Sequence, residues 1–190
     1  MISLVNASKR YGPKLLFEGV NWLITPQDRV GLVGANGTGK STVMKILAGL
    51  ETVDSGEYST QKGITAGYLP QDGLTLSGRS VFQECLSVFD RLKDMEKEME
   101  TIAHSLSDLD PVSDEYHAAS DRYSQLDSEF RNHDGYALEA KVGAVLTGLG
   151  FAKEDWTKRT EYFSGGWQMR IALGKLLLAQ PNLLLLDEPT

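Results

Sequence analysis

Residues 31–42 read GLVGANGTGKST, a stretch whose residue types and spacing could hold a phosphate. Gly34, Gly39, Lys40 and Ser41 satisfy the pattern G-x-x-x-x-G-K-[S/T]. Glycines let the backbone curl so that successive N–H groups point at phosphate oxygens, and a following helix adds its positive end. Lys40 would reach the β- and γ-phosphates of a nucleoside triphosphate, and the Ser41 hydroxyl would hold Mg²⁺. A simple glycine turn is the alternative. The candidate nucleotide-binding residues are Gly34, Asn36, Gly37, Thr38, Gly39, Lys40, Ser41 and Thr42.

Two carboxylates could complete a magnesium site with this loop. Asp187 and Glu188 directly follow the apolar run Leu183–Leu186. A magnesium nucleotide site needs a carboxylate at the end of a neighbouring strand, and Asp187 could bind the metal through water. Glu188 could orient or deprotonate the attacking water, which makes it the candidate catalytic residue. A solvated strand end without chemistry is the alternative.

Short apolar stretches predict the elements that position these residues. Arg29–Val33 is expected as a buried strand that runs into the glycine loop, and Lys40–Leu47 as a helix that ends at Gly49. Leu183–Leu186 is expected as a central parallel strand covered on both faces. The other expected strands are Ile2–Val5, Leu15–Ile24, Glu57–Ser59 and Ile64–Leu69.

The middle of the chain has a different periodicity. Its apolar residues follow steps of three and four along two segments, which keeps one seam on each helix. Between the segments, Leu109-Asp110-Pro111 interrupts the pattern, and Asp110 or Ser113 could cap the second helix. The pattern predicts an antiparallel helical hairpin, and ordinary helices lying on the core are the alternative. The seams comprise Cys85, Val88, Leu92, Met95, Met99, Ile102 and Leu106, then Tyr116, Ala119, Tyr123, Leu126 and Phe130.

The charge of the chain is concentrated in this middle segment. The net charge is −7, and residues 91–134 hold twelve acidic against five basic residues, so the remainder is balanced. Direct DNA or RNA binding through this segment is disfavoured, because phosphate neutralisation needs clustered Lys and Arg. His104, His117 and His133 also lie here, and we interpret them as solvated helix or turn residues.

Composition predicts a cytoplasmic protein, and no membrane is expected among its partners. The chain has no run of about 18 apolar residues, and its start lacks the pattern of a signal peptide. The single cysteine, Cys85, can form no internal disulfide and is expected to be a core thiol in a reducing compartment.

The segment from Phe163 to Gln168, FSGGWQ, resembles the signature of ATP-binding-cassette ATPases, whose usual form is LSGGQ. Phe163 and Trp167 depart from that form in a way that is similar to the ABC-F branch. Ser164 would start a helix, so that its hydroxyl and the following N–H groups form a second anion site. The resemblance implies that Ser164, Gly165 and Gly166 act in trans, on the γ-phosphate of ATP held by an opposite ATPase half.

The resemblance extends to two more positions. Gln71 matches the glutamine that senses the metal and the γ-phosphate in this family, which implies a metal role beside Ser41 and Asp187. Tyr11 is placed like the aromatic residue that stacks on adenine, although a tyrosine that fills the core is an alternative. The matches span Ser8 to Thr190.

The length of the middle segment favours the ABC-F branch. Residues 72–163 number 92, more than a transporter cassette typically needs there, and the surplus resembles the arm of ABC-F proteins. The resemblance implies a nucleotide-driven clamp with ATP and Mg²⁺, a second ATPase cassette in the same full-length chain, and the ribosome as partner. The nucleotide-binding subunit of a transporter is the main alternative; a hairpin that is only an interaction module is another. A DNA-repair or chromosome-organising cassette is disfavoured by the single cysteine and the short seams.

The resemblance also gives the expected fold class and segments. We expect an α/β P-loop NTPase of ABC type, with a mixed sheet, an N-terminal antiparallel part and a helical subdomain that carries the hairpin. The expected segments are 1–79 for the nucleotide-binding core, 80–163 for the helical subdomain with the hairpin at about 85–134, and 164–190 for the signature helix and acidic strand. The family continues beyond this point with Asn-His-Leu-Asp and a switch histidine, so ATPase activity of this stretch alone is expected to be weak or absent.

Overall fold

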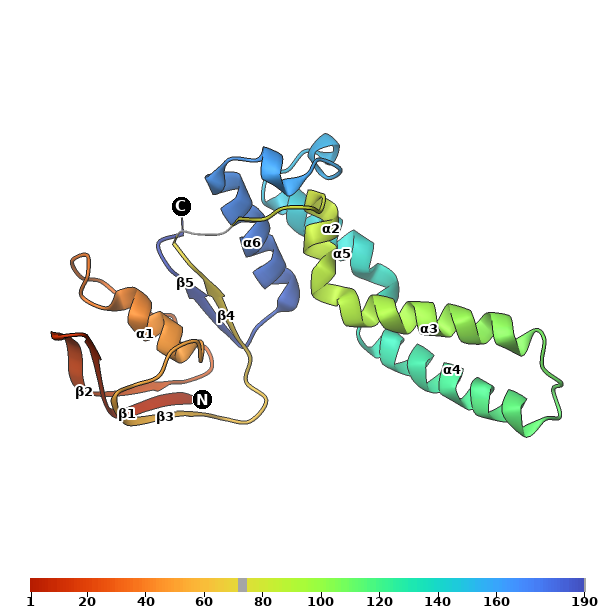
Figure 1. The fold of residues 1–190 in the computed structure, drawn as a ribbon, viewed down its shortest axis with the longest axis horizontal. Helices are drawn as coiled ribbons and strands as arrows, with labels where there is room; N and C mark the ends of the chain where they lie inside the picture. The colour runs from red at the N-terminus through yellow and green to blue at the C-terminus, as the bar shows by residue number, and fades with distance from the viewer. Residues whose placement is uncertain (72–74, 190) are drawn as a thin grey trace. The chain divides into compact units, whose positions relative to one another are not determined.

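The computed structural model describes residues 1–71 and 75–189 of the chain. It divides into two compact units, which we call the core unit (Met1–Thr75 with Ala179–Thr190) and the helical unit (Leu76–Leu178). The core unit contains both sheets and α1, and the helical unit contains the remaining helices (Figure 1).

A three-stranded antiparallel sheet opens the core unit. β1 (Ile2–Tyr11) lies between β2 (Lys14–Ile24) and β3 (Ser55–Thr60). The register of β1 with both neighbours shifts after Leu4 or Val5, where Asn6 adopts a left-handed backbone and donates its N–H to the Asn21 side chain at 2.8 Å. This irregularity bends β1 in the way that β-bulges bend edge and barrel strands.

One helix and a small parallel sheet position the glycine loop at residues 34–39, which we call the phosphate loop because a phosphate is its expected ligand. β4 (Ala66–Leu69) pairs in parallel with β5 (Leu183–Leu186), and α1 (Lys40–Leu47) follows the loop. α1 packs on the antiparallel sheet through its buried side chains (Figure 1). The core of this unit consists of Ile2, Leu4, Ala7, Met44, Ile46, Leu47 and Leu185.

Two strand predictions for this unit are wrong. Residues 29–33 form no strand; Val33 is 97% exposed, and the chain leaves a turn at Gln27 with φ at 82°. β5 is not central in the described part of the chain, where it pairs with β4 alone and Leu184 is 39% exposed. The two errors have one cause: residues 29–32 line a cavity beside β5 without pairing with it, since an apolar run specifies burial and not a hydrogen-bonding neighbour.

The helical unit is built around one apolar cluster. α2 (Val81–Leu86) begins with a capping box between Ser80 and Gln83, and α5 (Leu138–Gly148) and α6 (Gly165–Ala179) pack with it. Short 3₁₀ turns lie at Ser87–Phe89, Gly135–Ala137, Lys153–Asp155 and Thr160–Tyr162. The buried cluster comprises Val81, Cys85, Leu86, Leu138, Val142, Leu146, Phe151, Ile171 and Leu178. Burial raises the pKa of the Cys85 thiol to about 12, as expected of an inert core thiol.

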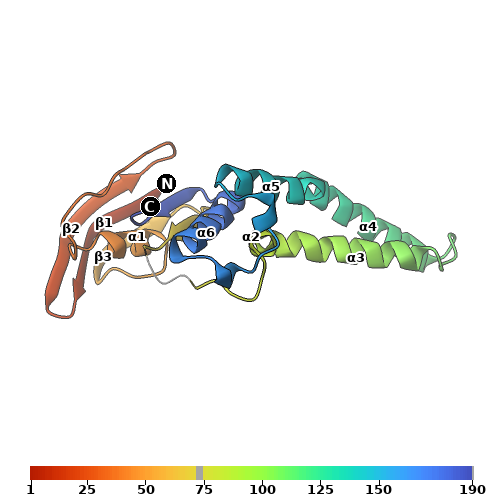
Figure 2. The same cartoon turned by 90° about the horizontal axis from the view of Figure 1, so that it is seen from above.

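The helical hairpin consists of α3 (Asp90–Leu106) and α4 (Asp114–Asn132), which run side by side (Figure 2). Met95, Met99, Leu126 and Phe130 form a core of their own, with ion pairs from Arg91 to Glu129 and from Arg122 to Glu98 along its rim. Ser113, and not Asp110, caps α4, by accepting the N–H of Tyr116.

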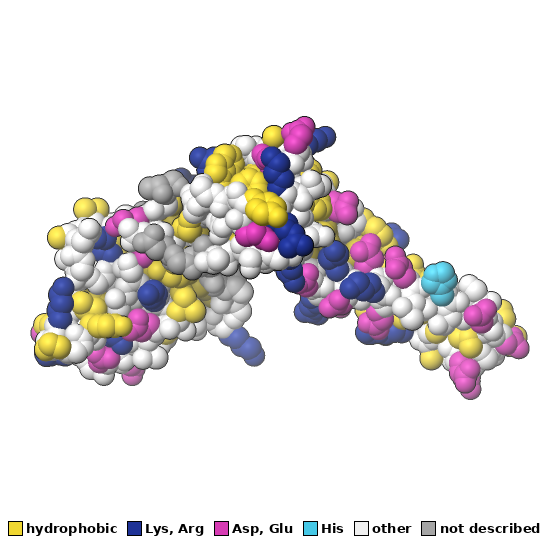
Figure 3. Space-filling model, turned by 45° about the horizontal axis from the view of Figure 1, so that its top comes forward, with side chains coloured by type: hydrophobic (Ala, Val, Ile, Leu, Met, Phe, Trp, Pro, Cys, Tyr) yellow, Lys and Arg dark blue, Asp and Glu magenta, His cyan; other side chains and the backbone are white. Residues whose placement is uncertain are grey.

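The first predicted seam is longer than the first helix of the hairpin. Cys85 belongs to α2 and Val88 to a 3₁₀ turn, so that the seam is divided between two elements before α3 begins. On the face of the hairpin shown in Figure 3, acidic and basic side chains are mixed near its base, and the charged side chains toward its tip are acidic.

Candidate functional site

A cavity of about 440 Å³ in the core unit gathers most of the residues that the sequence singled out. The phosphate loop and the first turn of α1 supply most of its wall, β2 and the end of β1 supply another part, and Gln71 and Glu188 come from the segments after β4 and β5. Its lining residues are Tyr11, Lys14, Leu16, Asn36, Gly37, Gly39, Lys40, Ser41, Thr42, Gln71 and Glu188. Residues far apart in the sequence therefore meet around one space.

Two glycines give the loop its shape. Gly37 and Gly39 have φ values of 76° and 100°, which side chains rarely tolerate. A Cβ on Gly39 would also lie 3.2 Å from the Leu16 Cβ, so the loop packs closely on β2. Gly39 is the N-cap of α1, and it offers no side chain to satisfy the first N–H groups of that helix. These N–H groups face the cavity end of α1 and suit an anion.

Two ammonium groups rest on carbonyl oxygens of the loop. Lys40 donates to Gly34 O at 2.9 Å and to Ala35 O at 3.3 Å. Lys14 donates to Gly37 O at 2.7 Å. The Thr38 hydroxyl donates to Ala35 O at 2.9 Å, which braces the loop from within.

Lys14 was missed by the sequence interpretation. Its only cue was its position three residues after Tyr11, on the strand against which the loop packs, and that position does not identify the group that Lys14 binds. Both lysines can exchange a carbonyl for a phosphate oxygen, because an ammonium group has three rotatable donors.

The two carboxylates have different surroundings. Asp187 is 2% exposed, and its side chain accepts the hydroxyl of Tyr68 at 3.0 Å. It is therefore no solvated strand end. Glu188 is exposed and lies at the cavity, where its carboxylate accepts the amide N–H of Gln71 at 2.7 Å. Glu188 also has a left-handed backbone with φ at 49°, a conformation that costs a non-glycine residue about 1 kcal/mol or more.

The Tyr68 phenol has an altered acidity. Burial, together with the hydrogen bond to Asp187 and the negative charge of that group, raises the pKa of Tyr68 to about 12. The phenol thus remains a donor at neutral pH and holds the Asp187 carboxylate in place.

Asp187 and Tyr11 differ from the other candidates. Asp187 lines a second cavity of about 840 Å³, which is largely apolar and shares Lys40 and Glu188 with the first. Tyr11 is 70% exposed, so it does not fill the core, and its ring is accessible at the edge of the cavity.

The signature turn, Phe163–Gly166, belongs to the helical unit. Ser164 is the last residue before α6, and its carbonyl accepts the N–H of Gln168 at 2.9 Å. Ser164, Gly165 and Gly166 are exposed. Trp167 packs against Phe151 with ring centroids 4.8 Å apart, and Arg170 lies over its ring. The tryptophan therefore anchors the start of α6 while the small residues before it stay open.

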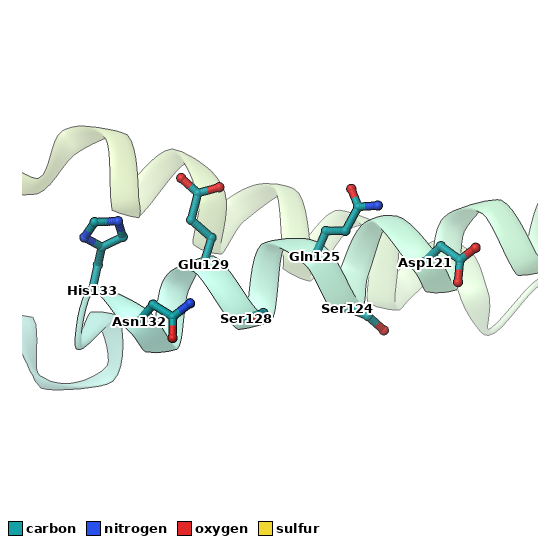
Figure 4. A pocket seen from close by; sticks show the side chains of 7 residues that line it. All are labelled: Asp121, Ser124, Gln125, Ser128, Glu129, Asn132 and His133. Carbon is teal, nitrogen blue, oxygen red and sulfur yellow. The ribbon is translucent and has the colours of Figure 1, made fainter.

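A shallow groove of about 580 Å³ along α4 is not a site of this kind. Its lining side chains come from α4 and the residue after it, and they point in different directions (Figure 4). They are Asp121, Ser124, Gln125, Ser128, Glu129, Asn132 and His133. The groove has no loop of N–H donors, unlike the cavity of the core unit.

The described part of the chain, residues 1–71 and 75–189, contains no helix with both the length and the apolar character needed to span a membrane.

Comparison with known proteins assigns the family. The family model described as ABC transporter matches residues 17–190. The ATP-binding protein YdiF of Bacillus subtilis is 43% identical over 100% of this chain and 29% of its own length. ABC transporter F family member 2 of Arabidopsis thaliana is 33% identical over 100% of this chain and 28% of its own.

The fold agrees with this assignment. The dimeric structure of a bacterial ABC transporter cassette matches with a TM-score of 0.62 and 18% identity, covering 100% of this chain and 75% of the other. The predicted fold class is thereby confirmed. The chain spans about 30% of the length of the curated relatives YdiF and F family member 2. The match over residues 17–190 means that this chain belongs to the ABC transporter family and carries its ATP-binding domain.

Proposed function

We propose that this chain is the first ATPase cassette of an ABC-F protein, which binds and hydrolyses ATP with Mg²⁺ and acts as a nucleotide-driven clamp on the ribosome in the cytoplasm. The support comes from three directions. A phosphate loop and a carboxylate–amide pair line one cavity, a relative named as an F family member matches the whole chain, and a helical hairpin projects from the helical unit.

The residues around the cavity suit a magnesium nucleotide. Lys40 would bind the β- and γ-phosphates, and the backbone N–H groups at the start of α1 would donate hydrogen bonds to other phosphate oxygens. Asn36 and Thr42 add polar groups to the same wall, and Tyr11 offers an accessible ring for the base. The bound Mg²⁺ would neutralise charge that develops on the phosphates. Ser41, Gln71 and Asp187 are the residues proposed to hold it.

Hydrolysis needs a base or an orienting group for water. Glu188 is exposed at the cavity, so its carboxylate can accept a proton from a water that approaches the γ-phosphate. The side-chain amide of Gln71 donates a hydrogen bond to this carboxylate, with 2.7 Å between Nε2 and Oε2. The proposed sensor of the nucleotide is therefore in direct contact with the proposed base.

The clamp requires a partner for each nucleotide. The exposed Ser164, Gly165 and Gly166 would bind the γ-phosphate of ATP held by a second cassette in the same full-length protein. In return, the signature turn of that cassette would cover the ATP on Lys40. ATP would then join the two cassettes, and hydrolysis would release them.

The hairpin is the single observation that carries the ribosomal assignment. It has its own buried core, distinct from the apolar cluster around α2, α5 and α6, so it can extend from the unit as an independent arm. An extended hairpin of this kind supports the proposal, because it resembles the arm expected of ABC-F proteins. The second candidate, a nucleotide-binding subunit of a transporter, is favoured by the likeness of the fold to a transporter cassette.

Replacement of Glu188 by Gln in the full-length protein tests this proposal. The variant should bind ATP but hydrolyse it at least about a hundredfold more slowly, since the base is lost while binding groups remain. It should then co-sediment with ribosomes in the presence of ATP. Glu57→Gln, at an exposed position on β3, is the matched control and should hydrolyse ATP normally.

The outcomes separate the two candidates. Rapid turnover by Glu188→Gln would contradict the role of Glu188. A trapped variant that stays in the supernatant, and instead co-purifies with a membrane protein, would favour the transporter subunit.

A further inference from the structure

Gln168 lies directly behind the signature turn and uses its whole side-chain amide to bind backbone. It is 9% exposed, in the first turn of α6. Its carbonyl oxygen accepts the N–H of Leu76 at 3.1 Å. Its NH₂ group donates to the carbonyl oxygens of Thr160 at 3.3 Å and Phe163 at 3.2 Å. Both amide hydrogens and one acceptor site are therefore occupied.

These bonds extend a ladder between two segments of the helical unit. The N–H of Gly78 binds the Glu161 carboxylate at 3.1 Å, and the N–H of Thr160 binds the carbonyl of Arg79 at 3.0 Å. Further along, the N–H groups of residues 81 and 82 bind the carbonyls of residues 158 and 156, each at 3.0 Å. Residues 76–82 and 156–163 are thus joined repeatedly, and Gln168 supplies the bonds closest to Ser164.

The two joined segments lie close in sequence to the two proposed nucleotide sensors. Leu76 follows Gln71 by five residues, and Phe163 directly precedes Ser164. We infer that Gln168 is a positioning residue that couples residues 76–82 to the signature turn, so that the two segments move together. Its catalytic consequence rests on the proposed function, whereas the coupling itself does not. Gln168 is not proposed as a catalytic residue, because the hydrogen bonds of its side-chain amide go to backbone groups.

The substitution Gln168→Glu makes the coupling dependent on pH. The ionised side chain of this variant would direct a carboxylate at two carbonyl oxygens in a buried place, which is repulsive and leaves no donor for either. Protonated, the same group has the shape of the glutamine amide, accepts from Leu76 and donates to one carbonyl. Burial beside acceptors favours the protonated form, so the defect of Gln168→Glu should reverse on acidification.

Hydrogen exchange in the full-length protein measures this effect at the Leu76 amide. In Gln168→Glu at about pH 8, that amide should exchange roughly tenfold faster than in the wild type at the same pH. At about pH 5.5 the two proteins should agree within about twofold. Gln168→Met, which is similar in size and makes none of the three bonds, should show faster exchange at both pH values. Gln125→Glu, exposed on α4, is the matched control and should match the wild type throughout.

ATPase kinetics provide the readout that a purely structural role would not change. Gln168→Glu should lower kcat about tenfold at about pH 8 with KM for ATP nearly unchanged, because Gln168 is not among the residues that line the cavity at Lys40. The loss should shrink at about pH 5.5, relative to the wild type at that pH. If the wild type itself shows no ATPase, the proposed function fails, while hydrogen exchange still decides the coupling.

Three results would overturn the inference. They are wild-type exchange at Leu76 in both variants, a defect of Gln168→Glu that is equal at both pH values, and failure of Gln168→Glu to fold even at about pH 5.5. A variant that is native only at the lower pH supports it.

Discussion

Lys40 and Lys14 both place an ammonium group on the backbone of the phosphate loop, yet they should not be equivalent. Lys40 is the first residue of α1, and its ammonium group donates to two carbonyl oxygens of the loop. The exposed Lys14 donates to one. Lys40→Ala should weaken ATP binding about tenfold to a hundredfold, as expected for a charge-assisted phosphate contact. Lys14→Ala should weaken it less than about fivefold. Titration with a fluorescent ATP analogue measures both, and equal effects would contradict the assignment.

The Tyr68–Asp187 pair predicts a loss of stability in alkali. The folded protein keeps the Tyr68 proton up to about pH 12, whereas the unfolded chain releases it near the ordinary phenol pKa of 10.0. Between these values the unfolded state binds fewer protons, so the free energy of unfolding falls as the pH rises. Tyr68→Phe should lack this component. Absorbance titration at the phenolate band measures the pKa of Tyr68 as the midpoint of the difference in absorbance between the wild type and Tyr68→Phe. A midpoint near pH 10, and not near 12, would contradict the prediction.

The sequence predicted which residues line the cavity of the core unit better than it predicted their hydrogen-bond partners. The glycine pattern of the loop requires particular backbone angles, which Gly37 and Gly39 adopt. Gln71 and Glu188 are joined by a hydrogen bond although 117 residues separate them. The sequence suggested each residue separately, Gln71 by the family resemblance and Glu188 by its place after an apolar run, and it did not predict their contact. Lys14 and Tyr68 escaped notice, because a lysine or a tyrosine on a strand has no local signal for the group that it will bind.

Among the elements of the helical unit, the close approach of Gly135 to Phe130 fixes how the end of α4 packs on the 3₁₀ turn that follows it. A Cβ on Gly135 would lie 2.5 Å from three atoms of the Phe130 ring, which is itself 1% exposed. Gly135→Ala should therefore lower the free energy of unfolding by about 1–3 kcal/mol through overpacking.

A second glycine provides the control for this prediction. Gly148 ends α5 with no atom within 4 Å of an added Cβ. Gly148→Ala should be neutral or raise stability slightly, because alanine loses less entropy in a helix. Urea denaturation followed by circular dichroism compares the two, and equal stabilities would count against the packing argument.

Periodicity predicted helices more reliably than strands in this chain. The steps of four from Met95 to Met99 and from Leu126 to Phe130, within the repeating pattern of threes and fours, placed the four residues that form the hairpin core. The strand predicted at residues 29–33 is absent, because a strand needs a hydrogen-bonding neighbour and the residue types of a segment do not specify that neighbour. The seam through Cys85 was interrupted for a similar reason: the 3₁₀ turn at Ser87–Phe89 separates α2 from α3 while the apolar spacing continues.

For the whole molecule, the distribution of charge separates the hairpin from the rest. Residues 96–127 hold nine acidic and two basic residues, so their net charge is −7. This value equals the net charge of the complete chain, and the remaining residues therefore sum to zero. Carboxylates repel ribosomal RNA, so the proposed contact of this segment with the ribosome must involve a protein surface, or the basic contacts must lie elsewhere in the full-length protein.

Replacement of residues 96–127 by a short Gly/Ser linker in the full-length protein tests this separation. The apolar cluster around Val142 and Ile171 includes none of the replaced residues, and the cavity at Lys40 lies in the core unit. ATP affinity should therefore change less than about twofold, the scale of ordinary surface changes. Association with ribosomes in the Glu188→Gln background should be lost if the proposed role holds, because the arm proposed to carry it is gone. Ribosome pelleting that is unchanged by the replacement would show that the hairpin is not the ribosomal contact; a large loss of ATP affinity would show instead that the two units depend on each other for nucleotide binding.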